Sequence, residues 1–215
     1  KPEITWLSAE SYEKDLTILE ELKNFDGVIV PGGFGKRGVE GKIAAIKYVR
    51  ENNIPFLGLC YGLQLAVVEF ARNVCGLEDA HTVEVNPDTS RPVICTMPDQ
   101  FVKIQEKKMG GSMRLGEYKC KLAKQSLSRK LYGRELISER HRHRYEVNNH
   151  YRLKLESKGL LVAGVNPQRK LVEVIEIPEH KFFVATQFHP EFKSRPLSPH
   201  PLFAGLIKAA IGVKI

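Results

Sequence analysis

The sequence predicts an α/β fold, in which helices flank a doubly wound, mostly parallel sheet and additional short antiparallel strands extend it. Residues 25–74 alternate short apolar runs with helical patterns, as buried strand–helix–strand–helix units do. Three more apolar runs, at 160–166, 171–177 and 182–188, predict further strands. With 215 residues, of which 42% are hydrophobic, the chain is long enough for a single domain, residues 1–215, with a substantial core.

The predicted elements follow one another along the whole chain. In the first half we expect a strand at 4–7, a helix within 10–22, a strand at 25–30, a helix at 43–51, a strand at 54–59 and a helix to about residue 74. In the second half we expect short strands at 83–85, 93–94 and 112–118, one or two helical turns at 126–132, a strand at 136–147, a helix capped by Asn148 and an amphipathic helix at 202–211. The Lys-rich stretch 98–109 is expected to be a mobile loop.

The most informative stretch joins the strand at 54–59 to the helix after it. It reads Gly58-Leu59-Cys60-Tyr61-Gly62, a nucleophile elbow with cysteine at its centre. The two glycines permit a tight turn in which the central residue has strained backbone angles. Such a turn places the Cys60 sulfur at a helix N-terminus, where N–H groups and the helix dipole stabilise a thiolate. Taken alone, the stretch also fits a buried structural cysteine.

A second constellation supplies the partners that a cysteine nucleophile needs. His189 and Glu191 follow the apolar run 182–188, and on a strand their side chains would lie on one face, with Pro190 stiffening the pair. A base takes the thiol proton, and a carboxylate orients the base. Cys60, His189 and Glu191 are therefore the candidate catalytic triad. A lone histidine at a strand end is more often structural, so the argument depends on its pairing with the elbow.

These residues carry a family resemblance. G-L-C-Y-G-L-Q with a later H-P-E resembles the class I (triad) glutamine amidotransferases, which hydrolyse glutamine to glutamate and ammonia through a γ-glutamyl thioester. P-G-G-F-G from Pro31, G-G-S-M-R-L-G from Gly110 and E-R-H-R-H-R-Y-E-V-N-N from Glu139 resemble the C-terminal glutaminase domains of the CTP synthases. The resemblance runs from about Phe25 to the C-terminus and implies the flavodoxin-like fold of that class.

The resemblance also implies further site residues. The backbone N–H groups of Gly33 and Tyr61 would form an oxyanion hole. Many relatives carry leucine in place of Tyr61, a departure that could alter substrate access but leaves the backbone donor. Glu84 would pair the ammonium of glutamine and Arg144 its carboxylate. The full set implied to bind glutamine is Gly33, Tyr61, Gly62, Leu63, Gln64, Glu84, Arg144 and Tyr145. Taken alone, Gln64, Glu84 and Arg144 read more simply as solvated surface residues.

By the same resemblance, the domain has partners. Ammonia would pass to a synthetase domain of the same enzyme, which aminates UTP to CTP with ATP and Mg²⁺, and this domain itself would hold no cofactor or metal. CTP synthases are activated by GTP and are homo-oligomers, here expected to be tetramers. Lys36, Arg37 and Arg114 are basic residues near the expected mouth of the site. Our hypothesis is that they bind the nucleotide or dock the synthetase domain.

The sequence departs from the family pattern at its start. It begins about one strand–helix unit late and lacks the synthetase domain, so we expect either a piece of the protein or a relative with a different start. Gly41-Lys42 lacks the first glycine and the hydroxyl residue of a P-loop, which argues against ATP binding by that route. Residues 33–38 fit G-x-G-x-x-G, but the next strand ends in Cys60 rather than an acid, which argues against an NAD site.

Composition excludes some classes of protein. No run approaches the roughly 18 apolar residues of a membrane helix, and the N-terminus lacks the apolar core of a signal peptide. Cysteines at 60, 75, 95 and 120 form no C-x-x-C pair, which argues against zinc and fits reduced thiols in the cytoplasm. The net charge of +8 is mostly spread out, and no nucleic-acid motif accompanies it. An acidic nucleotide or an acidic partner surface explains that charge as well.

Two other functions stay open at this point. Another γ-glutamyl thiol hydrolase, or the amidotransferase of a different synthetase, would carry the same triad and would differ in its substrate. A non-catalytic binding domain would keep the fold and show no turnover.

Overall fold

The computed structural model describes residues 2–96 and 113–213, so the predicted loop at 98–109 lies outside the described residues. The first half contains α1 (Ala9–Lys14), η1 (Leu16–Asn24), β1 (Val28–Val30), α2 (Val39–Glu51), β2 (Phe56–Leu59), α3 (Tyr61–Asn73), β3 (Ala80–Thr82) and β4 (Arg91–Thr96). The second half contains β5 (Arg114–Leu122), α5 (Leu127–Tyr132), β6 (Leu136–His143), β7 (Tyr145–Val147), η3 (Asn149–Tyr151), α6 (Arg152–Glu156), β8 (Leu161–Val165), β9 (Val172–Glu176), β10 (Phe183–Thr186), η4 (Pro190–Phe192) and α7 (Pro201–Ala210).

The main sheet has seven strands in the order β1-β2-β10-β9-β8-β5-β6. β1, β2 and β10 run parallel, and each pair from β10 to β6 is antiparallel. β3, β4 and β7 form a separate small sheet. The predicted α/β class, with a helix-flanked sheet that is parallel around the site, is confirmed. The antiparallel part is more extensive than the short strands that we predicted, because β5 spans nine residues and β6 eight.

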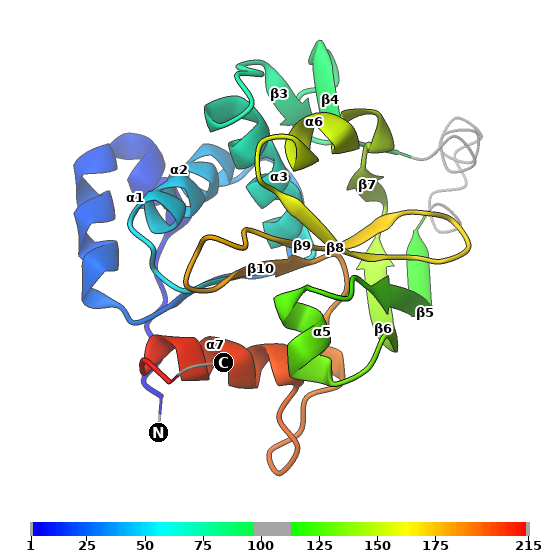
Figure 1. Ribbon diagram of the computed structural model, residues 1–215. Coiled ribbons are helices and arrows are strands. Elements are labelled where there is room, and N and C mark those ends of the chain that lie inside the picture. The colour runs from blue at the N-terminus through cyan, green and yellow to red at the C-terminus, as the bar shows by residue number, and fades with distance from the viewer. Residues whose placement is uncertain (1, 97–112, 214–215) are drawn as a thin grey trace.

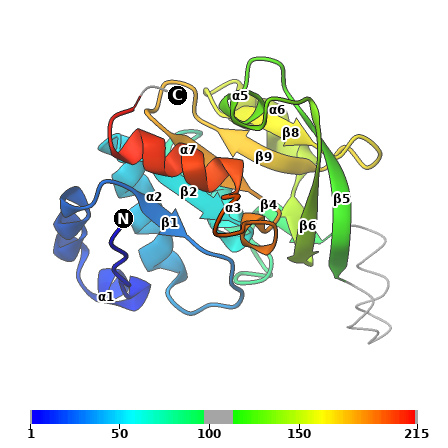
Figure 2. The same ribbon diagram turned by 90° about the horizontal axis from the view of Figure 1, so that it is seen from below.

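Helices cover both faces of the main sheet (Figures 1 and 2). α2 and α3 lie on one face, and α7 lies on the other with α5 beside it. Because both faces of the sheet are covered, a central strand such as β2 has apolar side chains on both of its faces. Phe56 packs in the core cluster that includes α2 and α3, whereas Leu57 and Leu59 pack in the cluster that includes Leu202 and Leu206 of α7. Since β2 is buried on both sides, it reads as an unbroken apolar run.

The carboxyl ends of the three parallel strands meet at one edge of the sheet. Gly58 of β2 pairs in register with Val30, the last residue of β1, and with Ala185 of β10. Cys60 follows β2 directly, and His189 follows β10. Sites in open α/β sheets form beyond these carboxyl ends, so the fold places the candidate nucleophile and base where the sequence predicted a site.

The N-terminal segment differs from the prediction. Residues 4–7 form no strand, and Ile4 and Trp6 are 76% and 87% exposed, so their apolar character does not reflect burial in this chain. The single helix expected within 10–22 is divided into α1 and η1. Asp15 is extended at the break (φ −148°), and its carboxylate accepts a hydrogen bond from the Thr17 N–H over 2.9 Å, which caps the start of η1.

The strand predicted at 136–147 is two strands. β6 pairs with β5 in the main sheet, whereas β7 pairs with β4 in the small sheet, and Arg144 lies between them. The local sequence does not reveal the change of partner sheet, because both segments are extended and only one residue separates them. Asn148 caps η3, as its side chain accepts a hydrogen bond from the His150 N–H, and α6 follows directly.

Candidate active site

Cys60 occupies the turn between β2 and α3 in a strained conformation, with φ 51° and ψ −95°. Its N–H donates to the carbonyl oxygen of Thr186, at the end of β10, over 2.6 Å. The flanking glycines remove side chains from close contacts. A Cβ on Gly58 would lie 2.9 Å from the backbone of Gly62, and one on Gly62 would lie 2.2 Å from the carbonyl oxygen of Val30. The elbow that the sequence predicts is therefore present.

His189 and Glu191 form the expected pair, but they do not lie on a strand. β10 ends at Thr186, and the two residues belong to the start of the short 3₁₀ helix η4. Nδ1 of His189 lies 2.6 Å from Oε1 of Glu191. The helical turn, with Pro190 at its first position, brings the carboxylate back onto the imidazole. The predicted strand geometry is wrong, although the predicted pairing is present.

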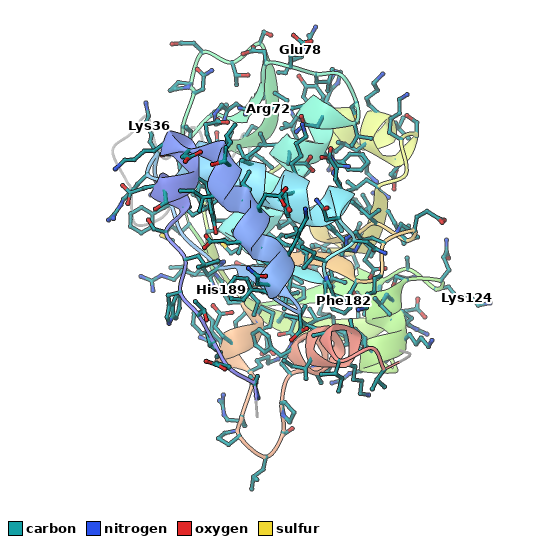
Figure 3. The ribbon with its side chains drawn as sticks, turned by 90° about the vertical axis from the view of Figure 1, so that its left-hand side faces the viewer. Lys36, Arg72, Glu78, Lys124, Phe182 and His189 are labelled. Atoms are coloured by element: carbon teal, nitrogen blue, oxygen red, sulfur yellow. The ribbon has the colours of Figure 1, made fainter. Side chains whose placement is uncertain are left out.

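Gly32 lies beside both the imidazole and the nucleophile. A Cβ on Gly32 would lie 2.9 Å from Cε1 of His189 and 3.7 Å from Cβ of Cys60, so the three residues surround one small space. Nε2 of His189 is buried and has no hydrogen-bond partner among the described residues. The residue as a whole is 8% exposed, and Figure 3 marks where it lies. The ring therefore has one nitrogen bound to Glu191 and the other available for proton transfer.

Burial dominates the electrostatics of Cys60. It raises the pKa of the thiol to about 12, against the lowering effect of the Tyr61 backbone N–H. The resting sulfur is thus a thiol at neutral pH rather than the thiolate expected from the helix N-terminus alone. Burial is the largest single influence on Glu191 and raises its pKa, but the hydrogen bond with His189, a backbone hydrogen bond and the charges of His189 and His200 together leave the pKa below its usual value. An ionised Glu191 keeps the His189 proton on Nδ1, which leaves Nε2 as the base.

The residues implied to bind the amino-acid end of a substrate lie close together. Oε1 of Glu84 accepts a hydrogen bond from the Gly35 N–H over 2.9 Å, which ties the glycine loop after β1 to the site. Burial raises the pKa of Glu84, and the charge of Arg144 opposes that rise. Burial likewise raises the pKa of Tyr145, with Glu84 adding to the rise and Arg144 opposing it. The Glu84 carboxylate and the Arg144 guanidinium are therefore close enough to influence each other and Tyr145.

Gln64, on the first turn of α3, is buried and connects this region to the nucleophile. Its Nε2 donates to the carbonyl oxygen of Tyr145 over 3.0 Å and to Oε1 of Gln187 over 3.4 Å. Its Oε1 has no hydrogen-bond partner among the described residues. The Leu63 side chain is fully buried in the core, so Leu63 can meet a substrate only through its backbone. The same holds for Gly62, which has no side chain.

The two proposed oxyanion donors come from neighbouring segments. A Cβ on Gly33 would lie 3.4 Å from Cδ1 of Tyr61, so the glycine loop after β1 packs against the start of α3. The Tyr61 hydroxyl donates to the carbonyl oxygen of Gly35 over 2.6 Å and holds the same loop from its other end. The side chain of Tyr61 thus has a structural contact beyond the backbone role that the sequence suggested.

The predicted effector residues do not form one group. Lys36 and Arg37 are exposed, Arg37 pairs with Glu10 over 2.6 Å, and Lys36 lies at the margin of the molecule in Figure 3. Arg114 contradicts the prediction, because its side chain is completely buried. Its guanidinium lies 2.5 Å from Glu173 and 3.5 Å from Glu146. A buried cation held by Glu173 and Glu146 is not available to a nucleotide at the mouth of the site, and a position in sequence beside a glycine-rich stretch did not reveal this burial.

Sequence reasoning missed three residues that contact the triad. Gly32 fits against His189, and Phe192 stacks on the same imidazole with ring centroids 4.9 Å apart and planes 18° apart. Nε2 of Gln187 donates to Sγ of Cys60 over 3.8 Å. The sequence offered one clue to these residues, which is that they lie next to predicted site residues. Gln187 and Phe192 flank His189 and Glu191, and Gly32 precedes Gly33.

Two negative findings concern only residues 2–96 and 113–213. Within these ranges no helix is both long enough and apolar enough to cross a membrane. The same residues contain no group of three or more His, Cys, Asp or Glu side chains that could hold a metal ion.

With this geometry in place, comparison with known proteins identifies the class. Residues 3–209 match the family of class-I glutamine amidotransferases, and the chain belongs to that family. Its similar relatives are CTP synthases: those of Caldanaerobacter subterraneus subsp. tengcongensis and Clostridium kluyveri are 57% and 56% identical over 99% and 98% of this chain. A solved Trypanosoma brucei CTPS glutaminase domain with bound acivicin covers 100% of this chain and 83% of its own, with a TM-score of 0.92 and 38% identity.

The match to the bacterial relatives covers only part of their length. The chain spans 39% of the Caldanaerobacter protein and 38% of the Clostridium protein. The similarity therefore concerns the amidotransferase part of CTP synthases, as the sequence motifs predicted.

Proposed function

We propose that this chain hydrolyses the side-chain amide of L-glutamine to glutamate and ammonia. The observation that carries the proposal is the constellation around Gly32: a strained, buried Cys60 and an imidazole whose Nδ1 is held by Glu191 and whose Nε2 has no partner among the described residues. Membership of the class-I amidotransferase family and similarity to an acivicin-bound glutaminase domain support it.

The reaction would begin with attack of the Cys60 sulfur on the amide carbon of glutamine. Because burial holds the pKa of the thiol at about 12, its proton would move to Nε2 of His189 as the sulfur–carbon bond forms. The N–H groups of Tyr61 and Gly33 would stabilise the oxyanion. His189 would then give the proton to the leaving nitrogen, and the carbon–nitrogen bond would break to release ammonia and leave a thioester.

The second half-reaction would return the site to its resting state. His189 would take a proton from water, the resulting hydroxide would attack the thioester, and the sulfur would leave and regain the proton. Glu191 would hold the imidazole tautomer and stabilise the imidazolium throughout. Glu84 would bind the α-ammonium of glutamine, and Arg144 would bind its α-carboxylate. Both groups lie at the end of the substrate opposite the amide that Cys60 attacks.

In the whole protein, we propose that the ammonia aminates UTP to CTP in a synthetase domain that binds ATP and Mg²⁺. The named relatives support this part of the proposal. Activation by GTP and assembly into a tetramer are further expectations for the complete protein. Lys36 and Arg37, the exposed cations of the loop after β1, stay candidates for contacts with the nucleotide or the partner domain.

The test is glutamine hydrolysis by the chain, with a diazo-ketone glutamine analogue as a covalent probe. We expect the probe to label Cys60 and glutamate to form, and Cys60→Ser to abolish both. Cys75→Ser, at the opposite end of α3, is the matched control and should change neither. Labelling without turnover would show a glutamine site that needs its partner domain. Absence of both in a folded chain would refute the proposal, and turnover of γ-glutamyl peptides in place of glutamine would favour another γ-glutamyl hydrolase.

A further inference from the structure

The Cys60 sulfur has a side-chain hydrogen-bond donor besides the backbone N–H of Tyr61. Nε2 of Gln187 lies 3.8 Å from Sγ, within the range of a hydrogen bond to sulfur. Gln187 is completely buried and follows β10 directly. Its own N–H donates to the carbonyl oxygen of Glu173 over 2.8 Å, so the residue is anchored on the neighbouring strand β9.

A chain of hydrogen bonds fixes the orientation of this amide. The carbonyl oxygen of Tyr145 can only accept, so the group that Gln64 directs toward it must be its NH₂. The same NH₂ lies 3.4 Å from the Gln187 side chain, which must therefore direct its oxygen toward Gln64. The NH₂ of Gln187 is then left to face the sulfur. The opposite orientation would set two NH₂ groups against each other, lose the hydrogen bond from Gln64 and place an oxygen against the sulfur that becomes a thiolate.

A backbone hydrogen bond also connects Cys60 to the end of β10. The Cys60 N–H donates to the carbonyl oxygen of Thr186, and the next residue along β10 directs its side chain at the sulfur. Two consecutive residues at the end of β10 thus hold the nucleophile through its backbone and through its side chain. His189 follows them on the same segment.

We propose that Gln187 is a positioning residue that donates a hydrogen bond to the Cys60 sulfur and stabilises the thiolate as it forms. This inference rests on the proposed function of Cys60 as the nucleophile. The amide of glutamine does not titrate, so Gln187 contributes a hydrogen bond only, and the thiol proton moves to His189. Through Gln64, the sulfur is also linked to the backbone of Tyr145, beside Arg144.

The energetic role follows from the burial of the thiol. A thiolate taken from water needs donors to replace its hydration, and burial is the main cause of the high Cys60 pKa. Hydrogen bonds to charged groups are roughly twice as strong as neutral ones. Loss of the donor should slow formation of the thiolate, and with it every reaction of the sulfur, by about tenfold to a hundredfold.

Two variants separate this role from a structural one. Gln187→Met keeps the length of the side chain and removes the donor. Gln187→Glu keeps an oxygen for the Gln64 NH₂ but directs a second oxygen at the sulfur. Gln168→Leu, at an exposed position, is the control for removing a glutamine amide. The readout is the rate at which iodoacetamide alkylates Cys60 between pH 6 and 9.5, measured on the Cys60 peptide by mass spectrometry so that Cys75, Cys95 and Cys120 do not contribute.

We expect both Gln187 variants to alkylate about tenfold to a hundredfold more slowly at a given pH, with Gln187→Glu the slower, and the rate–pH profile to move to higher pH. Glutamine hydrolysis should lose kcat while KM stays within a fewfold. A folded Gln187→Met or Gln187→Glu chain with an unchanged alkylation profile would overturn the inference. Absence of glutamine hydrolysis by the unmodified chain would count against the proposed function instead, because alkylation tests Gln187 without any substrate.

Discussion

Gly32 lies so close to His189 that a Cβ at this position would be 2.9 Å from Cε1 of the imidazole. Real Cβ atoms do not approach so closely, so the imidazole can occupy its position only because residue 32 has no side chain. Gly32 is not in a left-handed conformation, and its contribution is therefore space rather than backbone freedom. The loop after β1 thus supplies a proposed oxyanion donor at Gly33 and also the room for the base.

Gly32→Ala should displace the imidazole and reduce kcat for glutamine by roughly a hundredfold, because a misplacement of about 1 Å costs that much in a positioned reaction. Thermal unfolding should change little by comparison. Gly27→Ala is the matched control, since its added Cβ would meet ordinary contacts of 3.4 Å. Steady-state kinetics and calorimetry on both variants check the prediction, and an unchanged kcat in Gly32→Ala would contradict it.

Glu191→Gln should lower kcat by roughly a hundredfold to a thousandfold, because the neutral amide no longer stabilises the imidazolium or fixes the tautomer. The 2.6 Å contact with Nδ1 makes this the pair to test. KM should stay within a fewfold, since Glu191 is not among the residues proposed to bind glutamine. Glu179→Gln, an exposed substitution of the same kind, should match the unmodified chain. Equal kcat values for the two variants would show that the pair is only structural.

Cys60→Gly should be more stable than Cys60→Ala by about 1 kcal/mol, since alanine is strained at φ 51° and glycine is not. Both variants lose the sulfur, so their difference isolates the backbone. The corresponding pair at Cys75, which does not have a positive φ, should show the opposite order. Urea unfolding of the four variants measures the free energies. The same order at both positions would argue against strain at the elbow.

The contribution of Glu146 to the stability of the chain should fall as pH rises from about 5 to 9. Burial raises the pKa of this carboxyl group to about 8, against the influence of Arg114. Between the ordinary pKa of 4.5 and about 8, the native state holds the proton more firmly than the unfolded state, so raising the pH through this window favours unfolding.

Glu146→Gln should therefore flatten the decline in melting temperature between pH 5 and 9. The expected gain at pH 9 relative to pH 5 is a few degrees, since about 1 kcal/mol shifts the melting temperature of a domain of this size by roughly 2–4 °C. Glu78→Gln, at an exposed position, should keep the slope of the unmodified chain. A Glu146→Gln chain with an unchanged slope would show that Glu146 does not titrate in this range.

The features of the fold that could be predicted are those set by local pattern. The elbow at Cys60 and the apolar strands β2, β9 and β10 were predicted because a strand buried on both faces leaves a continuous apolar run. The division between β6 and β7 at Arg144 could not be predicted, because it depends on which strands are neighbours in space.

The same distinction applies to the site. Cys60, His189 and Glu191 were found because each is a reactive type in a recognisable local stretch. Gln187 has an unreactive side chain and Gly32 has none, and only the approach of β1, β2 and β10 brings them to the triad. Arg114 was misjudged for the complementary reason, because a charged residue near a glycine-rich stretch suggests exposure, whereas Glu146 and Glu173 come to it from distant strands.

The place of β10 in the sheet has a consequence for the order in which activity can arise. β10 is the last of the strands in the chain, yet it lies between β2 and β9 in the sheet. It holds Cys60 through Thr186 and leads to His189. During synthesis from the N-terminus, the nucleophile is made long before its base, and no partial chain that ends before Phe183 can assemble the pair. The proposed hydrolysis of glutamine therefore cannot begin until the segment that carries His189 has been made and β10 has entered the sheet.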